Sequence, residues 1–362
     1  MLRRTLLVLT ATLASLLLFT GSALACGGLV NSNGTVTLVR TTTMAAYHRG
    51  VEHYVTSFEF AGGKGEFGSI IPLPGVPSKV IRGGEWTLQR LVQETQPQPE
   101  QALFAAAGAS LAEDRAVVLL KTKIDALDIV VLQGGGTAVG NWAREHGFFL
   151  PPDAPEVLDF YAERSPIFMA VRFDASRAAE QGLDVGDGTP VHVVIPTTNP
   201  WVPLRILGLG ATADAPIEAD VYLLTDLVPA ILPGAVAPSS AAFLEGTGTS
   251  PGLVLERSEP ASTTLLTDLR SDKGMNWLPR SGMWLTYLRL DSRAGDLTYD
   301  LAIDASGAGQ PSPRAAGMPA ATRGGDEGIG PFGTALWVAA AMLGLLGLVG
   351  ALERRRFHRP AI

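Results

Sequence analysis

Cysteine is almost absent from this chain of 362 residues, and its single copy is Cys26. One cysteine cannot form an intrachain disulfide or a zinc site built from several thiolates. Charged residues are also sparse, at 17% of the chain, against about 25% in an average soluble protein. Stability must therefore come mainly from a hydrophobic core.

The sequence also lacks the short motifs of familiar catalytic sites. It contains no G-x-S-x-G nucleophile turn, no H-E-x-x-H zinc motif, no P-loop and no dinucleotide fingerprint. These absences favour a non-enzymatic function, and we expect no cofactor.

The N-terminus has the three-part pattern of a secretory signal peptide. Met1 to Arg4 is short and cationic, Thr5 to Phe19 is apolar, and Ala23-Leu24-Ala25 matches an A-x-A cleavage site. Cleavage there places Cys26 at the new N-terminus. The alternative is a first helix that is not cleaved.

The C-terminus contains a better candidate for a membrane anchor. Phe332 to Leu352 has no charged residue and would span about 31 Å as a helix, which matches the core of a bilayer. The arginines Arg354, Arg355 and Arg356 follow directly, and basic residues beside a span stay in the cytoplasm. We therefore expect a single-pass protein with its C-terminus inside the cell and its large N-terminal part outside.

The expected exported part is acidic. Without the basic residues of the two ends and Glu353, 22 cationic and 34 anionic side chains remain. This balance argues against nucleic acid as a partner. The expected partners are the lipid bilayer, through the C-terminal helix, and an envelope protein or surface ligand.

Segments rich in β-branched and aromatic residues outnumber helical ones and do not alternate strictly with them, which predicts a sheet-rich α+β fold. Residues 35–48 and 51–61 predict a hairpin, 202–210 a strand, and 283–291 with 297–304 a second hairpin. Helices are expected at 85–95, 137–147, 154–165 and 262–272.

Residues 305–330 have few large apolar side chains and are expected to form a flexible, disordered stalk. The expected organisation is a signal peptide at 1–25, an extracytoplasmic domain at 26–304, the stalk at 305–330, a transmembrane helix at 331–353 and a basic tail at 354–362. The domain could contain two subdomains, with a break near 97–112 or 186.

Several segments together resemble a known bacterial family. They are "ACGG" after the signal peptide, "GSIIPLPGVP", "REHGFFLPPDAPEVLDFYAERSPIFMAVRF", "VIPTTNPWVPLRILGLG" and "WLTYLRLD". In this order they resemble the bacterial domain of unknown function 2330 family, over roughly Cys26 to Asp304. The resemblance implies an exported, often membrane-anchored bacterial domain, and it supplies no catalytic residues.

Cys26 is a weak candidate for a catalytic residue. It could be lipidated, although a lipobox places Leu three residues before the cysteine, where this chain has Ala23. It could be an N-terminal nucleophile whose own α-amine acts as the base, or a redox or metal-binding thiol. The simplest interpretation is that Cys26 only marks the start of the mature chain.

Histidine and tryptophan supply the other weak candidates. His48 and His53 flank the first hairpin, with Glu52 beside His53, and could approach each other as metal ligands, with His192 or His146 as a distant third. Trp201, Trp277 and Trp284 lie in irregular or proline-framed stretches and are candidate binding anchors. Ordinary surface or core roles are the alternative for all of them.

Two function classes follow from these observations. The favoured one is a cell-surface binding or scaffold module anchored in the membrane. The alternative is an extracytoplasmic hydrolase that uses Cys26 or an unrecognised site of histidine and carboxylate groups. Convergence of Cys26, His48, His53 and His192 in one pocket would favour the hydrolase.

Overall fold

The computed structural model describes residues 29–31, 37–61, 67–84, 86–95, 116–182, 189–237 and 252–319. The chain divides into two compact units, Met1–Pro319 and Ala320–Ile362, and all described residues belong to the first. Cys26, the expected membrane span and Arg354 to Arg356 lie outside the described residues. What the sequence predicts for them therefore stays a prediction.

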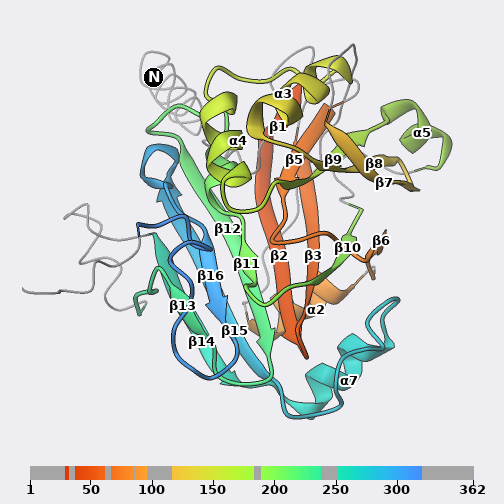
Figure 1. The fold of residues 1–362 in the computed structure, drawn as a ribbon. Coiled ribbons are helices and arrows are strands. Elements are labelled where there is room, and N and C mark those ends of the chain that lie inside the picture. The colour runs from red at the N-terminus through yellow and green to blue at the C-terminus, as the bar shows by residue number, and fades with distance from the viewer. Residues whose placement is uncertain are drawn as a thin grey trace, which may run out of the picture. The chain divides into compact units, whose positions relative to one another are not determined.

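A seven-stranded mixed sheet is the largest element of the first unit (Figure 1). Neighbouring strands are antiparallel, except that β12 runs parallel to β2. Across the sheet the order is β14 (Leu253–Pro260), β15 (Trp284–Arg293), β12 (Pro216–Thr225), β2 (Thr37–His48), β3 (Val51–Ala61), β10 (Val191–Pro196) and β6 (Lys79–Arg82).

Two smaller sheets accompany it, both antiparallel. The five-stranded sheet has the order β1 (Leu29–Asn31), β5 (Phe67–Pro72), β9 (Ile167–Phe173), β8 (Leu127–Gln133) and β7 (Val117–Ile124). The three-stranded sheet has the order β11 (Trp201–Val202), β16 (Leu301–Asp304) and β13 (Ala230–Leu232).

The described helices are short. They are α2 (Thr87–Thr95), α3 (Gly136–Glu145), α4 (Ala154–Ala162), α5 (Ala175–Glu180), α7 (Thr263–Ser271) and the 3-10 turns η1 (Arg205–Gly208) and η2 (Ala294–Asp296). In Figure 1, α3 and α4 lie at the top of the view and α7 at the bottom. The prediction of a sheet-rich α+β fold is confirmed.

The first hairpin forms as predicted. Its turn consists of Arg49 and Gly50, both with positive φ (50° and 80°), a conformation that matches the twist of the flanking strands. Because side chains alternate along a strand, β3 presents Glu52 and Tyr54 to one face of the large sheet and His53 and Val55 to the other.

Each face of the large sheet has its own core. The inter-sheet core joins one face to the five-stranded sheet and to α3 and α4, through residues such as Tyr54, Ile70, Met169, Leu158 and Val221. The helix-side core packs α2 and α7 against the other face, through Val55, Leu91, Tyr222, Leu266 and Leu269. Since the inter-sheet core includes residues on both sides of 97–112 and of 186, it is continuous across both suggested subdomain breaks.

The start of α2 is fixed by a residue far away in the sequence. Asp272, just after α7, accepts hydrogen bonds from the backbone N–H of Thr87 (2.7 Å), from its hydroxyl (2.6 Å) and from the N–H of Trp86 (3.2 Å). A carboxylate at a helix N-terminus satisfies donors that have no partner within the helix. Asp272 thereby ties α2 to the end of α7.

The prediction of a strand over 202–210 is wrong for most of its length. Only Trp201–Val202 is extended, and η1 follows. The backbone N–H groups of Leu204 and Arg205 turn inward and donate to one carboxylate oxygen of Asp300, at 2.6 and 3.0 Å. Tertiary hydrogen bonds have overridden the local preference of this apolar segment for a strand.

Asp300 is completely buried and receives further donors. The Tyr161 hydroxyl donates to Oδ1 at 2.8 Å, and Arg164 pairs with Oδ2. The Arg164 side chain is only 7% exposed and lies over the rings of Phe160, Tyr161 and Trp201. Burial raises the pKa of Asp300, whereas the Arg164 guanidinium and the other donors oppose this by stabilising the charge.

The predicted hairpin between 283–291 and 297–304 does not form. β15 pairs with β12 and β14, whereas β16 joins the small sheet with β11 and β13. The chain leaves the large sheet through η2, and Asp300 turns toward Arg164 just before β16 begins.

The expected stalk differs from the structure in residues 305–319. Ala315 and Ala316 are buried, the Ala315 carbonyl accepts from Arg164 Nη1 (2.6 Å), and the Ala316 carbonyl accepts from the Asp300 N–H (2.9 Å). Because the side chains of Ala315 and Ala316 are small, the backbone carbonyls of these residues can approach the buried donors of Arg164 and Asp300. Residues 320–330 lie outside the described part.

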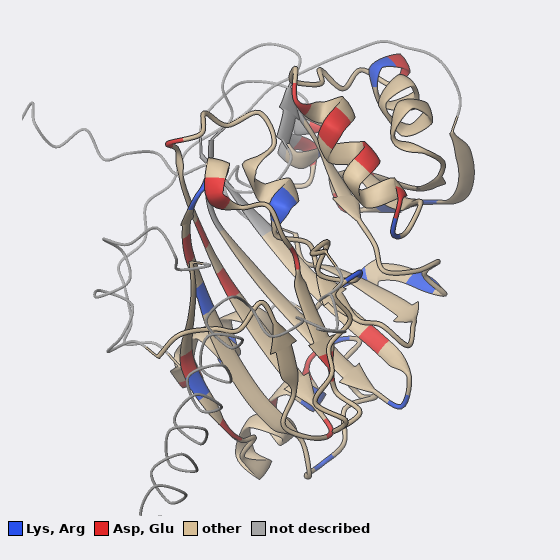
Figure 2. Ribbon diagram, turned by 60° about the vertical axis from the view of Figure 1, so that its left-hand side comes forward, with Lys and Arg blue, Asp and Glu red and all other residues tan. Residues whose placement is uncertain are grey.

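Among the described residues, no helix is long and apolar enough to cross a membrane. Acidic and basic residues are interspersed along the strands and helices of the ribbon in Figure 2, and the described part has no long basic stretch in this view.

We predict that replacing Arg164 by Met destabilises the protein strongly, because it leaves the buried Asp300 carboxylate without its cation. The expected loss is about 3–5 kcal/mol, measured by urea unfolding of the full chain. Arg257, paired with Glu259 at 3.1 Å on the surface, provides the matched control, and Arg257→Met should cost less than about 1 kcal/mol. Equal losses in the two variants would contradict the importance of the buried pair.

Candidate functional site

In the structure His53 contacts His192, whereas His48 contacts Asp226. His53 Nδ1 lies 3.0 Å from His192 Nε2, across the β3–β10 pairing. His48, at the end of β2, pairs through Nδ1 with Asp226 Oδ1 at 2.6 Å and is partly exposed. His146 hydrogen-bonds the Trp142 carbonyl at the end of α3 and stacks on the Trp142 ring.

Trp277 covers the histidine pair. Its indole stacks on the His53 ring with a centroid distance of 3.4 Å and an interplanar angle of 9°. It belongs to the loop after α7, where Arg270 donates to the backbone carbonyls of Asn276 and Leu278. Among the residues that the structure describes, the buried His192 Nδ1 and Trp277 Nε1 have no hydrogen-bond partner.

Both histidines are held neutral. Burial, with smaller contributions from His192 and His48, lowers the pKa of His53 to about 3. Burial lowers the pKa of His192 to about 4. At neutral pH one imidazole therefore donates to the other, and the pair is a polar contact at the edge of the helix-side core.

The described residues do not form a metal centre. No three side chains of His, Cys, Asp or Glu in this part of the chain gather closely enough to hold an ion. The weak metal candidates His48 and His53 lie on the same face of the sheet, but their close partners are Asp226 and His192.

The other two tryptophans have different surroundings. Trp201 is buried, stacks near Tyr161 (5.8 Å between centroids) and receives the Arg164 guanidinium on its ring. Trp284, at the start of β15, is partly exposed, and its Nε1 donates to the Ser258 hydroxyl at 2.9 Å. The structure therefore places Trp201 in the core, Trp277 over the histidines and Trp284 at a strand end.

Glu52, on the opposite face of β3 from His53, is an isolated buried carboxyl. It is completely buried, and within the described part of the chain neither of its oxygens has a well-formed hydrogen bond. Burial raises its pKa to about 8, and the backbone N–H of Trp201 offsets only part of this effect. Glu52 is therefore protonated at neutral pH.

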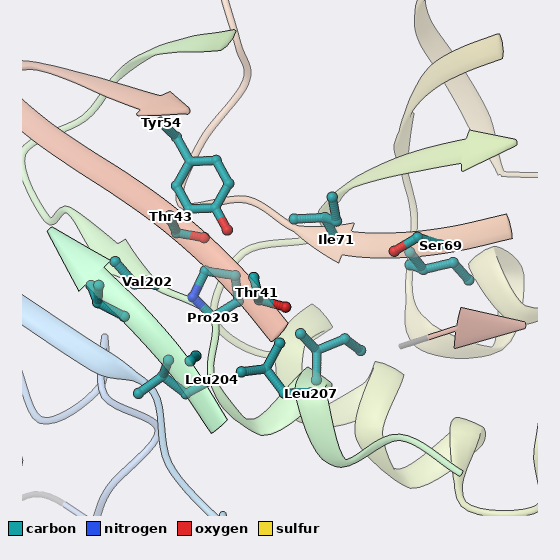
Figure 3. A pocket seen from close by; sticks show the side chains of 13 residues that line it. Thr41, Thr43, Tyr54, Ser69, Ile71, Val202, Pro203, Leu204 and Leu207 are labelled. Atoms are coloured by element: carbon teal, nitrogen blue, oxygen red, sulfur yellow. The ribbon is translucent and has the colours of Figure 1, made fainter. Parts of the chain in front are cut away.

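A small cavity lies within the inter-sheet core. Thr43 and Tyr54 line one side of it and Leu204 and Leu207 the other (Figure 3). Its volume of about 20 Å³ has room for one water molecule, far below the several hundred Å³ of a metabolite site. Thr41 Oγ1 and Ser69 Oγ, which have no hydrogen-bond partner among the described residues, could both hydrogen-bond such a water.

Sequence reasoning considered Glu52 only as a carboxylate beside His53 in a possible metal site, and it did not find the Asp300–Arg164 pair or the role of Asp272. One available signal for the burial of Glu52 was that it shares a strand face with the aromatic Tyr54. A similar signal for His192 was its place between two valines. No signal in the sequence connects Asp300 with Arg164, which precedes it by 136 residues.

A family model described as "Uncharacterized protein conserved in bacteria (DUF2330)" matches residues 20–228. The chain belongs to the DUF2330 family. The resemblance stated from the sequence is thus confirmed, although the matched range ends well before Asp304. No curated protein matches this DUF2330 member.

Solved structures of baculovirus P35 are weakly similar to it. Two of a mutated P35 after caspase cleavage share 8% identity with this chain, with TM-scores of 0.36 and 0.37, and the structure of P35 itself shares 9%, with a TM-score of 0.35. The matches cover 73–75% of this chain and 97–100% of the P35 chains. Likeness at this level supports no statement about the function of the DUF2330 protein.

We predict that acid destabilises the protein through the histidine pair. The native state keeps both rings neutral, whereas the unfolded chain binds protons near pH 6.5, so stability falls as the pH is lowered from 7 to 5. The expected loss is about 2 kcal/mol for each histidine. In urea unfolding at both pH values, His192→Gln should lose part of this dependence, and the surface control His146→Gln should keep it.

We predict the opposite pH dependence for Glu52. Its native pKa lies above the unfolded value, so its contribution to stability is complete below about pH 4.5 and is lost as the pH rises through 8. Glu52→Gln should therefore be more stable than the wild type at pH 8, by roughly 2–4 kcal/mol, with a smaller difference at pH 4.5. The exposed control Glu180→Gln should change stability little at either pH, and an unchanged unfolding curve for Glu52→Gln would contradict a neutral carboxyl.

Proposed function

We propose that this DUF2330 protein is an exported, membrane-anchored binding or scaffold module of the bacterial cell envelope. One observation carries the proposal: a secretory pattern at one end of the chain is combined with an uncharged run of bilayer length and three arginines at the other. The proposed partners are the lipid bilayer and an envelope protein or surface ligand.

The arrangement of the polar side chains supports binding over catalysis. The buried titratable groups described above are neutral or paired. His53 and His192 bond to each other beneath Trp277, and Asp300 binds Arg164. A catalytic base instead needs access to a substrate proton, and the cavity beside Thr41 and Ser69 has room only for one water.

One observation favours the alternative, an extracytoplasmic hydrolase. His48 is partly exposed and its Nδ1 is bound to the Asp226 carboxylate, which is how catalytic histidines are oriented as general bases. Hydrolysis of a model ester by the full chain that is lost in His48→Asn would support this alternative over a binding module.

We predict that the full chain behaves as a single-pass membrane protein. External protease should remove the N-terminal domain from intact cells or protoplasts, while a C-terminal epitope stays protected. Replacing Leu345 and Leu346 by Arg should release the chain from carbonate-washed membranes, because charges near the centre of a span oppose insertion; the matched control replaces both by Ile. A protease-resistant domain, or release of the wild type by carbonate, would contradict the proposed topology.

Intact mass spectrometry of the membrane-extracted protein tests the processing. A mass that begins at Cys26 without an addition supports cleavage and an anchor supplied by the C-terminal helix alone. A diacylglyceryl increment would show that Cys26 is lipidated, and a mass that begins at Met1 would contradict cleavage.

A further inference from the structure

We propose that the outer edge of β7 is the docking strand of this protein, and that its occupant is an extended, acidic segment of a partner protein that adds to the five-stranded sheet. This inference rests on the proposed function as a binding module and names the surface involved.

Among the described residues, β7 is a long sheet edge with no strand paired to its outer side, and β6 approaches it only where Arg82 binds Asp125 (2.6 Å), directly after β7 ends. It has eight residues and hydrogen-bonds only to β8 in this part of the chain. The other long edge, β14, is covered at its start by Val236, whose backbone exchanges two hydrogen bonds with Leu253 and Leu255 (2.9 and 2.8 Å). The remaining edge strands β1, β6, β11 and β13 have two to four residues each. Open strand edges are templates for pairing with another chain.

The start of β7 also exposes apolar side chains. Val117, Val118 and Leu119 are 63%, 38% and 39% exposed, and a bulge between Val118 and Leu120 interrupts the pairing with β8 there. Further along, Leu120 and Ile124 pack into the inter-sheet core, so the strand is anchored on one face. A partner strand would cover the three exposed side chains while the core holds β7 in place.

The charge around β7 selects an acidic partner. Lys121 is exposed, and Lys123 reaches Asp128 on the neighbouring strand at 2.8 Å. Arg172 and Arg177 share the same Asp128, at 3.4 and 3.2 Å, and Asp174 is the second carboxylate, bound to Arg177 at 3.2 Å. Lys123, Arg172 and Arg177 therefore gather around Asp128, and Lys121 adds a further positive charge on β7 itself, in a chain whose net charge is −7. Opposite charges across a strand pair stabilise it.

The same lysines argue against a second copy of this chain as the occupant. Two β7 strands paired edge to edge would bring four lysines onto one short ribbon, and like charges in close cross-strand positions are destabilising. Lysine on an edge strand is a common protection against self-association. The lysines of β7 thus disfavour pairing with β7 of a second copy of this chain and favour pairing with an acidic strand.

The test uses the full chain in detergent micelles and two fluorescent octapeptides, one alternating Glu and Val and one alternating Lys and Val. We expect fluorescence anisotropy to show binding of the Glu peptide at least about tenfold tighter than the Lys peptide, with an affinity that falls as salt is added. Amide hydrogen exchange of residues 117–124 should slow when the Glu peptide binds. Equal affinities, or protection confined to other strands, would overturn the proposal.

Charge-reversal variants locate the contact. The pair Lys121→Glu and Lys123→Glu should weaken binding of the Glu peptide about tenfold or more. If the double variant folds poorly, Lys121→Glu alone serves as the test, because it leaves the Lys123–Asp128 pair intact. The single variant should weaken binding of the Glu peptide by a smaller factor. The control pair Lys273→Glu and Arg280→Glu makes the same change of charge on the exposed loop after α7. Equal weakening by the double variant and its control would show a non-specific field effect and overturn the assignment to β7.

Photo-crosslinking in cells separates this inference from the proposed function. Benzoylphenylalanine would replace either Lys121 or Lys273. A crosslink from position 121 to an acidic segment of an envelope protein, competed by the Glu peptide, would support docking on β7. Crosslinks only from position 273 would overturn the β7 inference and leave the binding function standing. Crosslinks from neither position would count against the binding function itself.

Discussion

The ion pair between Asp300 and Arg164 is the contact on which the rest of the first unit depends. A buried carboxylate is tolerated only when a cation and several donors surround it, and Asp300 collects these from distant segments. α4 supplies Tyr161, the turn after α4 supplies Arg164, and the turn before η1 supplies two backbone N–H groups. The carbonyls of Ala315 and Ala316 accept from the Arg164 side chain and from the Asp300 N–H. Breaking the pair would therefore loosen α4, η1, β16 and the segment after it together.

A second constraint acts on β3: its buried titratable side chains must stay uncharged. Its successive residues Glu52 and His53 point to opposite cores, and burial keeps both in their neutral forms. The histidine has a polar partner in His192, whereas the carboxyl has no well-formed hydrogen bond among the described residues. One strand thus carries an acid and a base whose ordinary charges are both suppressed by the same physical cause, the loss of water.

Local features of the sequence were sufficient for much of the fold and for little of the site. The hairpin around Arg49 and Gly50, the helices α3, α4 and α7 and the excess of strands follow from periodicity and turn residues, which act over short distances. Residues 202–210 and the course of the chain after β15 could not be predicted, because hydrogen bonds to Asp300 decide them. The pairing of His53 with His192 depends on the register between β3 and β10. That register could not be derived from the two histidines' positions in the sequence.

The position of β12 has a consequence for the evolution of the family. The family match ends at residue 228, directly after β12, yet the other neighbour of that strand is β15, and the acceptor for the Leu204 and Arg205 amides is Asp300. Both lie in the last part of the chain. A relative that diverges or stops after the matched region must supply another strand beside β12 and another acceptor for those amides, from its own sequence or from a second protein. The part of the chain beyond the family match therefore supplies the strand and the acceptor that complete the matched part.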